Sequence, residues 1–166
     1  MIEISPATQD DVDAYVAMAR EAQAWIAARG LRQYVPAAHE AYAAAVAARV
    51  AAGTLYKVRQ RDETIAFFAL DACGPAWWDS FEGSALYVSG IVVTRSARGR
   101  GIGGEIIRFC EREAARRDCP FLRLDCHAGN AWLCAYYERQ GFELQARIEQ
   151  QKGYEGCLYQ RSVLTS

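Results

Sequence analysis

Apolar residues recur along the chain at two spacings, one typical of strands and one typical of helices. Alternating or continuous apolar runs predict strands over residues 1–5, 55–59, 64–71, 87–93, 121–126, 142–151 and 157–163. Apolar residues three or four positions apart predict helices over residues 12–29, 39–52, 102–116 and 131–140. This order favours a single α/β domain over residues 1–166, with a mixed, twisted sheet of about six or seven strands and about four helices.

The segments between these elements carry further signals. A proline in the connector over residues 31–38 blocks a continuous helix. Polar residues 60–63 (QRDE) predict a hairpin whose turn is longer than two residues. The loop over residues 72–84 contains Trp77 and Trp78, and we expect one ring to cover the core and the other to line a pocket.

A glycine-rich segment separates the strand over residues 87–93 from the helix that begins at Ile102. Its glycines, at 99, 101, 103 and 104, exceed what a turn requires, and they allow the main chain to approach a ligand closely. A helix N-terminus attracts phosphate, and Arg95, Arg98 and Arg100 add positive charge. The segment therefore predicts a phosphate site, against the simpler reading of a tight turn beside a solvated basic run.

The phosphate ligand is not fixed by these residues alone. Gly99, Gly101 and Gly104 satisfy the dinucleotide pattern G-x-G-x-x-G, and Asp125 ends a strand about where a ribose-binding acid is expected. In that fingerprint, however, the first glycine stands at the end of the strand, whereas here residues 94–98 intervene. A P-loop is excluded because no Lys-Ser or Lys-Thr pair follows the last glycine.

Composition narrows the class of protein. The formal net charge of −1, with 23% charged residues, gives no field that favours nucleic acid or an acidic membrane. The 6 cysteines lack metal-ligand spacing, and we expect free thiols in a reducing cytoplasm and no metal site. No apolar run of about 18 residues and no signal-peptide pattern is present, which favours a soluble cytoplasmic protein. The sequence leaves a homodimer open.

Two motifs resemble those of the GNAT family of N-acetyltransferases. Residues 98–103 (RGRGIG) fit the family signature (Q/R)-x-x-G-x-(G/A), after the expected apolar strand. Residues 130–142 (NAWLCAYYERQGF) are similar to the family pattern N-x(6)-Y-E-x-x-G-F. The resemblance covers about residues 85–145 and implies a GNAT-like fold, with acetyl-CoA as co-substrate and a primary amine of a small molecule or peptide as acceptor.

The chemistry of acetyl-CoA suggests where it binds. The glycine-rich segment suits its pyrophosphate, and the main chain at the end of the preceding strand can pair with its pantetheine arm. The resemblance implies that a bulge at Gly90 parts this strand from the next and leaves an N–H for the thioester oxygen; otherwise Gly90 only makes room for a side chain. The residues expected to bind the co-substrate are Ile91, Val92, Val93, Arg98, Gly99, Arg100, Gly101, Ile102, Gly103, Gly104, Asn130 and Tyr137.

Tyr137 is the candidate catalytic residue. The resemblance implies that its phenol protonates the departing CoA thiolate, and a phenol with a pKa of about 10 remains protonated at neutral pH. Asn130 precedes it by about two helical turns, so both side chains project to one side of the helix, which Asn130 caps. Without the motif, Tyr137 would be interpreted as a core aromatic residue. Its neighbour Tyr136 is the other tyrosine that could be the acid, but the register of the motif selects Tyr137.

The general base and the acceptor remain open. The base candidates are Asp79, Glu82, Tyr87 and His127, each more often an ordinary residue than a base. Acceptor contacts are expected from Trp25, Tyr34, Trp77, Trp78 and Tyr154. Adjacent strand residues point to opposite faces, so Cys126 and His127 do not form a nucleophile–base pair, and direct attack in a ternary complex is favoured. The alternatives are a non-catalytic acyl-CoA-binding regulator and a dinucleotide-dependent oxidoreductase.

Overall fold

The computed structural model describes residues 1–31 and 39–163, which contain seven strands and four α-helices. The helices are α1 (Val12–Ala27), α2 (His39–Ala52), α3 (Ile102–Arg116) and α4 (Ala131–Arg139). The strands are β1 (Ile2–Pro6), β2 (Leu55–Gln60), β3 (Glu63–Asp71), β4 (Ala85–Val93), β5 (Phe121–His127), β6 (Glu143–Gln151) and β7 (Tyr154–Ser162). Every predicted element is found, and the connector over residues 32–38, with Tyr34, lies outside the described residues.

The strands form one mixed sheet in the order β1-β2-β3-β4-β5-β7-β6. β4 and β5 are parallel, whereas β1–β2, β2–β3, β5–β7 and β6–β7 are antiparallel. A parallel pair requires a long crossover connection, and α3 supplies it between β4 and β5. The predicted mixed α/β class is therefore confirmed.

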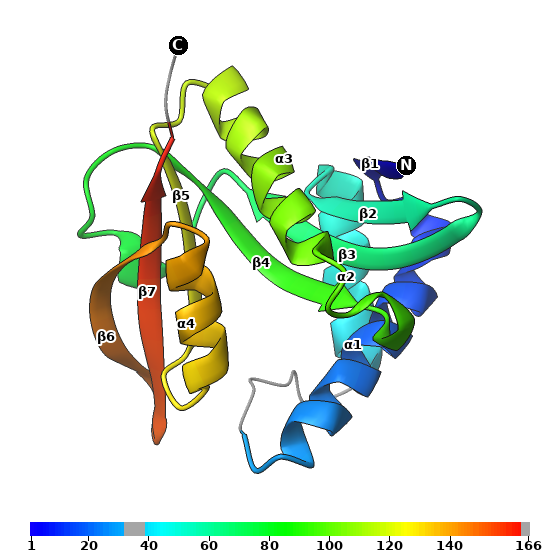
Figure 1. Ribbon diagram of the computed structural model, residues 1–166, viewed down its shortest axis with the longest axis horizontal. Helices are drawn as coiled ribbons and strands as arrows, with labels where there is room; N and C mark the ends of the chain where they lie inside the picture. The colour runs from blue at the N-terminus through cyan, green and yellow to red at the C-terminus, as the bar shows by residue number, and fades with distance from the viewer. Residues whose placement is uncertain (32–38, 164–166) are drawn as a thin grey trace. The chain divides into compact units, whose positions relative to one another are not determined.

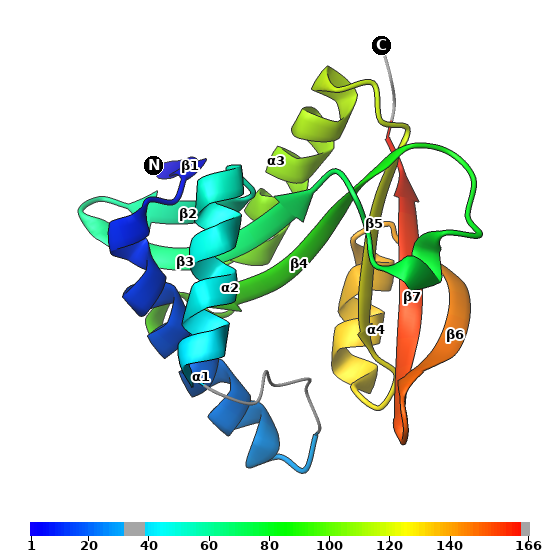
Figure 2. The same cartoon turned by 180° about the vertical axis from the view of Figure 1, so that it is seen from behind.

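The chain divides into two compact units, and the first consists of residues 1–70 and 90–105. Its apolar core joins α1 and α2 to β2 and β3, and Figure 2 shows both helices beside these strands. Tyr15 of α1 lies at the centre, with its ring edge-on to Phe67 at a centroid distance of 5.5 Å. Burial of one apolar face of each helix, rather than intrinsic propensity, holds this unit together.

The hairpin between β2 and β3 corrects one prediction. Gln60 pairs with Glu63, so the turn contains only Arg61 and Asp62 and is a two-residue turn. Arg61 has a φ of 57°, the left-handed conformation that such tight turns require. The polar character of Gln60 and Glu63 suggests a longer loop, but the strand ladder continues through both residues. The Glu63 side chain is exposed, and the half-buried Gln60 side chain accepts a hydrogen bond from Arg100.

The second unit consists of residues 71–89 and 106–166. Here α4 and the loop over residues 72–84 lie on opposite faces of β5 and β7 (Figures 1 and 2). Within that loop Trp78 is buried, and its ring packs against Phe81 and Tyr87. The expectation that one tryptophan covers the core is confirmed for Trp78, whereas Trp77 remains 36% exposed.

Arg123 of β5 is the one buried charged residue of the described chain, with 1% of its surface exposed. Its guanidinium donates to Gln160 Oε1 (2.8 Å), to the Tyr87 hydroxyl (3.1 Å) and to the Glu82 carbonyl. The rings of Trp78, Phe81, Tyr87 and Phe121 surround it with centroids 5.2 to 6.0 Å from Cζ. Arg123 therefore ties the 72–84 loop to the sheet through a planar group that reaches several partners at once.

Candidate active site

The glycine-rich segment begins as a 3₁₀ turn over Arg95–Ala97 and continues into α3. Gly99 and Gly101 have φ values of 74° and 78°, a conformation that side chains with a Cβ rarely adopt. The N–H of Glu105 donates to the Gly101 carbonyl, but in the described residues no acceptor meets the N–H groups at positions 102, 103 and 104. These free amides at a helix N-terminus suit an anion.

The arginines of this segment are held in different ways. Arg98 Nε donates to the Val93 carbonyl (3.3 Å), and its guanidinium lies over the ring of Trp25 at 5.1 Å. Arg100 donates to Gln60 Oε1 (3.0 Å), whereas Arg95 is exposed. No carboxylate of the described residues pairs with Arg98 or Arg100, so their positive charges are not neutralised.

The ladder between β4 and β5 is short. It joins Ala85–Tyr87 to Phe121–Arg123 and stops there, although β4 continues to Val93 and β5 to His127. The ladder thus ends before Gly90, and a parting caused by a bulge at Gly90 stays a prediction. Ile91, Val92 and Val93 have no ladder partner in β5, which leaves that side of their main chain without the pairing a neighbouring strand would supply.

Two features of the structure favour glycine at position 90. Its φ is 58°, and the Tyr15 hydroxyl donates to its carbonyl at 3.2 Å. A Cβ at this position would lie 2.5 Å from the same hydroxyl oxygen. The alternative that Gly90 makes room for a neighbouring side chain is therefore supported, whereas the bulge with an N–H for the thioester oxygen stays a prediction.

Gly90→Ala is expected to lower the free energy of unfolding by about 1–3 kcal/mol, because the new Cβ adds backbone strain and a clash with Tyr15. The double variant Tyr15→Phe/Gly90→Ala removes the oxygen and keeps the strain, so the glycine substitution should cost less in the Tyr15→Phe background. Urea unfolding of the four proteins measures this coupling. An equal cost of the substitution in both backgrounds would show that the hydroxyl does not constrain this position.

Asn130 and Tyr137 lie on the helix where they were predicted. The Asn130 side chain caps α4 by accepting a hydrogen bond from the Leu133 N–H at 3.1 Å. The ring of Tyr137 is 8% exposed and packs edge-on against Phe142, with centroids 5.8 Å apart. Tyr137 is therefore a core aromatic residue, which is compatible with a second role for its hydroxyl.

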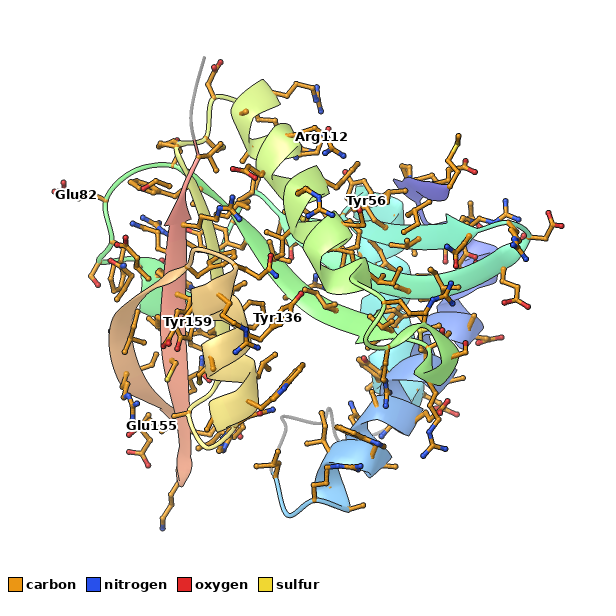
Figure 3. All side chains as sticks on the ribbon, viewed as in Figure 1. Tyr56, Glu82, Arg112, Tyr136, Glu155 and Tyr159 are labelled. Atoms are coloured by element: carbon orange, nitrogen blue, oxygen red, sulfur yellow. The ribbon has the colours of Figure 1, made fainter. Side chains whose placement is uncertain are left out.

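The protonation of the Tyr137 hydroxyl is set by burial and by its neighbours. Burial raises the pKa of the phenol, and nearby Cys126, Tyr136 and Asp125 raise it further, so it stays protonated at neutral pH. No hydrogen bond of this hydroxyl is formed within the described part of the chain. By contrast, the neighbouring Tyr159 hydroxyl donates to Glu138 Oε1 at 2.9 Å; Figure 3 labels Tyr159 on β7.

The predicted base candidates differ in their surroundings. Asp79 and Glu82 are exposed, and the Glu82 side chain points away from the sheet (Figure 3). The Tyr87 hydroxyl accepts a hydrogen bond from Arg123, and His127 Nδ1 accepts one from the Gly129 N–H at 2.7 Å. Each of these four side chains is therefore either exposed or has its basic atom engaged in a hydrogen bond.

The sequence suggests only a ribose-binding role for Asp125, and the structure gives this residue different surroundings. It is half-buried on β5, and its Oδ2 accepts a hydrogen bond from Trp77 Nε1 at 3.3 Å. Burial raises the pKa of this carboxyl, whereas the nearby Gln150 amide and the Trp77 indole oppose the rise. The sequence signal for Asp125 is an acid between apolar residues of a strand. Its neighbour Gln150 comes from β6, and residue spacing along the chain does not predict that contact.

The remaining aromatic candidates fall in both units. Trp25 is 37% exposed and stacks with Arg29, whose Cζ lies 3.5 Å from the ring centroid. Tyr154 of β7 meets the His127 ring edge-on at 4.4 Å. With the exposed Trp77, these rings offer apolar surface to an acceptor, each within its own unit.

No group of three or more His, Cys, Asp and Glu side chains of the described residues is arranged to hold a metal ion. The cysteines are free, with Cys126 Sγ and Cys134 Sγ 3.7 Å apart. None of the described helices is both long and apolar enough to cross a membrane.

Comparison with known proteins supports the motif assignment. The family model described as acetyltransferase (GNAT) family matches residues 22–142. No curated protein sequence gives a significant match. A GNAT-family acetyltransferase structure from Streptococcus agalactiae 2603 has a TM-score of 0.80 at 18% identity and covers 97% of this chain and 95% of its own.

Two further structures are similar in fold and are described by their acceptors. The ribosomal-protein-S18-alanine N-acetyltransferase from Escherichia coli has a TM-score of 0.70 at 16% identity, covering 100% of this chain and 96% of its own. A ribosomal L7/L12 alpha-N-protein acetyltransferase in complex with coenzyme A has a TM-score of 0.73 at 18% identity, covering 99% and 96%. At these identities the likeness establishes a shared fold.

Proposed function

Since the chain belongs to the acetyltransferase (GNAT) family, we propose that residues 1–166 form one N-acetyltransferase domain that transfers an acetyl group from acetyl-CoA to a primary amine. The acceptor is a small molecule or a peptide. Two structurally similar enzymes are described by protein substrates, an S18 alanine and the L7/L12 α-amine, which puts peptide N-termini first among the acceptors to be tried.

The glycine-rich segment would hold the pyrophosphate of acetyl-CoA. The N–H groups at positions 102, 103 and 104 meet no acceptor in the described residues, and the charges of Arg98 and Arg100 are unpaired. Free amides at the N-terminus of a long helix can donate two or three hydrogen bonds to an anion, and no existing hydrogen bond within the protein has to be broken first. This is the observation on which the proposal mainly rests.

The end of β4 would receive the pantetheine arm. Ile91, Val92 and Val93 extend beyond the last β4–β5 pair, so their main-chain groups are available to the amides of an extended ligand. Main-chain N–H groups near Gly90 would stabilise negative charge on the thioester oxygen as the amine attacks.

Tyr137 would act as the general acid. Its hydroxyl is protonated at neutral pH and has no internal partner, so it can donate to the departing thiolate of CoA. Asn130 would contact the co-substrate arm while it caps α4. We favour direct attack by the amine in a ternary complex, because burial raises the pKa of the Cys126 thiol and so weakens it as a nucleophile.

A thermal-shift experiment tests the binding half of the proposal. Acetyl-CoA and CoA at 100 times their dissociation constants should each stabilise the protein by about 2.7 kcal/mol, which raises the melting temperature by several degrees. Pantetheine lacks the diphosphate, and NAD lacks the pantetheine arm, so neither should shift it at the same concentration. A shift with NAD and none with CoA would contradict the proposal and favour the dinucleotide-dependent oxidoreductase.

Turnover tests the other half. Free thiol should be released from acetyl-CoA when primary amines are added, and mass spectrometry should find the acetylated amine. A panel of polyamines, aminoglycosides, amino acids and peptides covers the acceptor classes. Tight CoA binding without acetylation of any member would identify an acyl-CoA-binding regulator instead.

A further inference from the structure

The core of the first unit covers only the N-terminal half of α1. The buried residues of this helix are Val12, Tyr15, Val16 and Ala19, all in its first half. Figure 2 shows the C-terminal end of α1 extending past β2 and β3. Trp25 belongs to this uncovered part and is 37% exposed. A single exposed ring is common on protein surfaces, so its meaning depends on what surrounds it.

Two arginines from different segments meet at the Trp25 ring. Arg29, in the turn after α1, places its guanidinium carbon 3.5 Å from the ring centroid, a distance that only face-to-face stacking allows. The guanidinium carbon of Arg98, from the glycine-rich segment, lies 5.1 Å from the same centroid. Arg98 Nε also donates to the carbonyl of Val93, the last residue of β4. Trp25 and Arg29 therefore lie beside the end of β4, where acetyl-CoA is proposed to bind.

The positive charges beside Trp25 are not neutralised within the described residues. Neither Arg29 nor Arg98 forms an ion pair there. The neighbouring sequence supplies no acid, since residues 22–31 and 93–104 contain neither Asp nor Glu. Two like charges that share one ring repel each other, and an anion bound beside them would offset this repulsion.

The guanidinium of Arg29 is oriented to receive a carboxylate. Its Nη1 donates to the main-chain carbonyl of Trp25 at 3.1 Å, and no other hydrogen bond of Arg29 is formed in the described part of the chain. A guanidinium carries five N–H donors in one plane. With one face on the ring, its edge is left for two parallel hydrogen bonds to an oxyanion. The stacking also restricts the side chain, so less freedom is lost when a ligand binds.

We propose that Trp25 and Arg29 bind a carboxylate of the acceptor, and that the preferred acceptors are peptides with an acidic side chain close to the N-terminal amine. The assignment rests on the proposed N-acetyltransferase activity and names the acceptor class for it. An acidic side chain offers methylene groups to the exposed ring and a carboxylate to the guanidinium edge. The pyrophosphate of acetyl-CoA offers only the anion, and the free amides at positions 102–104 are available to it.

The deciding experiment compares two peptides that differ only in whether their second to fourth positions are Glu or Gln. The wild-type protein should acetylate the Glu peptide with a kcat/KM about 10-fold higher than that for the Gln peptide at low salt, the usual effect of a charged hydrogen-bonded pair. Arg29→Gln should reduce this ratio to about 1 by raising KM for the Glu peptide. Comparing the ratio between proteins cancels any difference intrinsic to the peptides.

Two further variants sharpen the comparison. Arg20→Gln is the matched control, because Arg20 stands on the same helix with its guanidinium carbon 5.6 Å from the Tyr42 ring centroid, and it should keep the wild-type ratio. Arg29→Glu reverses the charge and should favour a third peptide with Lys at the same positions over the Glu peptide. An unchanged ratio in Arg29→Gln, or an equal fall in Arg20→Gln, would overturn the assignment and leave the proposed activity intact.

The remaining outcomes separate the acceptor from the co-substrate. Calorimetry should give Arg29→Gln the wild-type affinity for both CoA and 3′-dephospho-CoA. A loss of affinity for CoA alone would assign Arg29 to the 3′-phosphate of the co-substrate instead. Acetylation of other amines but of neither peptide would overturn the acidic-peptide assignment. Acetylation of no amine at all by the wild-type protein would refute the proposed activity and the assignment with it.

Discussion

Tyr137→Phe is expected to lower kcat for acetyl transfer by about 10²- to 10⁴-fold, the usual contribution of a positioned general acid. The phenol is protonated at neutral pH because burial raises its pKa, and its hydroxyl is engaged by no other described residue. Removing the oxygen therefore takes away a proton donor and no internal hydrogen bond. The dissociation constant for acetyl-CoA, measured by calorimetry, should change by less than about 3-fold.

The helix offers a matched control for this variant. Tyr136, labelled in Figure 3, precedes Tyr137 on α4, is half-buried, and also has a raised phenol pKa because of burial. Tyr136→Phe should retain nearly full kcat, and both variants should melt close to the wild-type temperature because the ring packing is unchanged. Unaltered kcat in Tyr137→Phe, or the same loss in both variants, would reject Tyr137 as the acid.

The parts of the site that the sequence predicts are those built from neighbouring residues. Glycines before a helix determine the free amides of the 99–104 segment, and Asn130 caps its own helix. The periodicity of α3 and α4 likewise lies within single segments. Such features depend on local backbone geometry, which is why a motif of about ten residues is sufficient to predict them.

The second polar group beside Asp125 could not be predicted in this way. Gln150 reaches β5 only because a bulge displaces it in β6 and because Gly156 of β7 leaves room, which are properties of the register between three strands. The same limit explains the turn after Gln60, whose length depends on how far the ladder with Glu63 continues. Register follows from packing across the sheet rather than from the residues of one strand.

Arg123→Lys is expected to reduce the free energy of unfolding by about 3–5 kcal/mol, and Arg123→Met by less. The guanidinium donates in three directions, to Gln160, Tyr87 and the Glu82 carbonyl, and no carboxylate of the described residues compensates its charge. A lysine ammonium keeps the buried charge, is more strongly hydrated in the unfolded chain, and cannot reach all three acceptors from one point. The conservative substitution should therefore be the more damaging one.

The comparison of the methionine variant with the lysine variant separates the effect of the buried charge on stability from the effect of packing. Its side chain fills much of the space between the four rings and removes the cost of a buried cation, while the Gln160 and Glu82 oxygens lose a donor. Urea unfolding of both variants, followed by tryptophan fluorescence, to which Trp78 beside the substituted side chain contributes, gives the two free energies. A lysine variant at least as stable as the methionine variant would show that the positive charge itself, rather than the planar fork of donors, holds the 72–84 loop against β5.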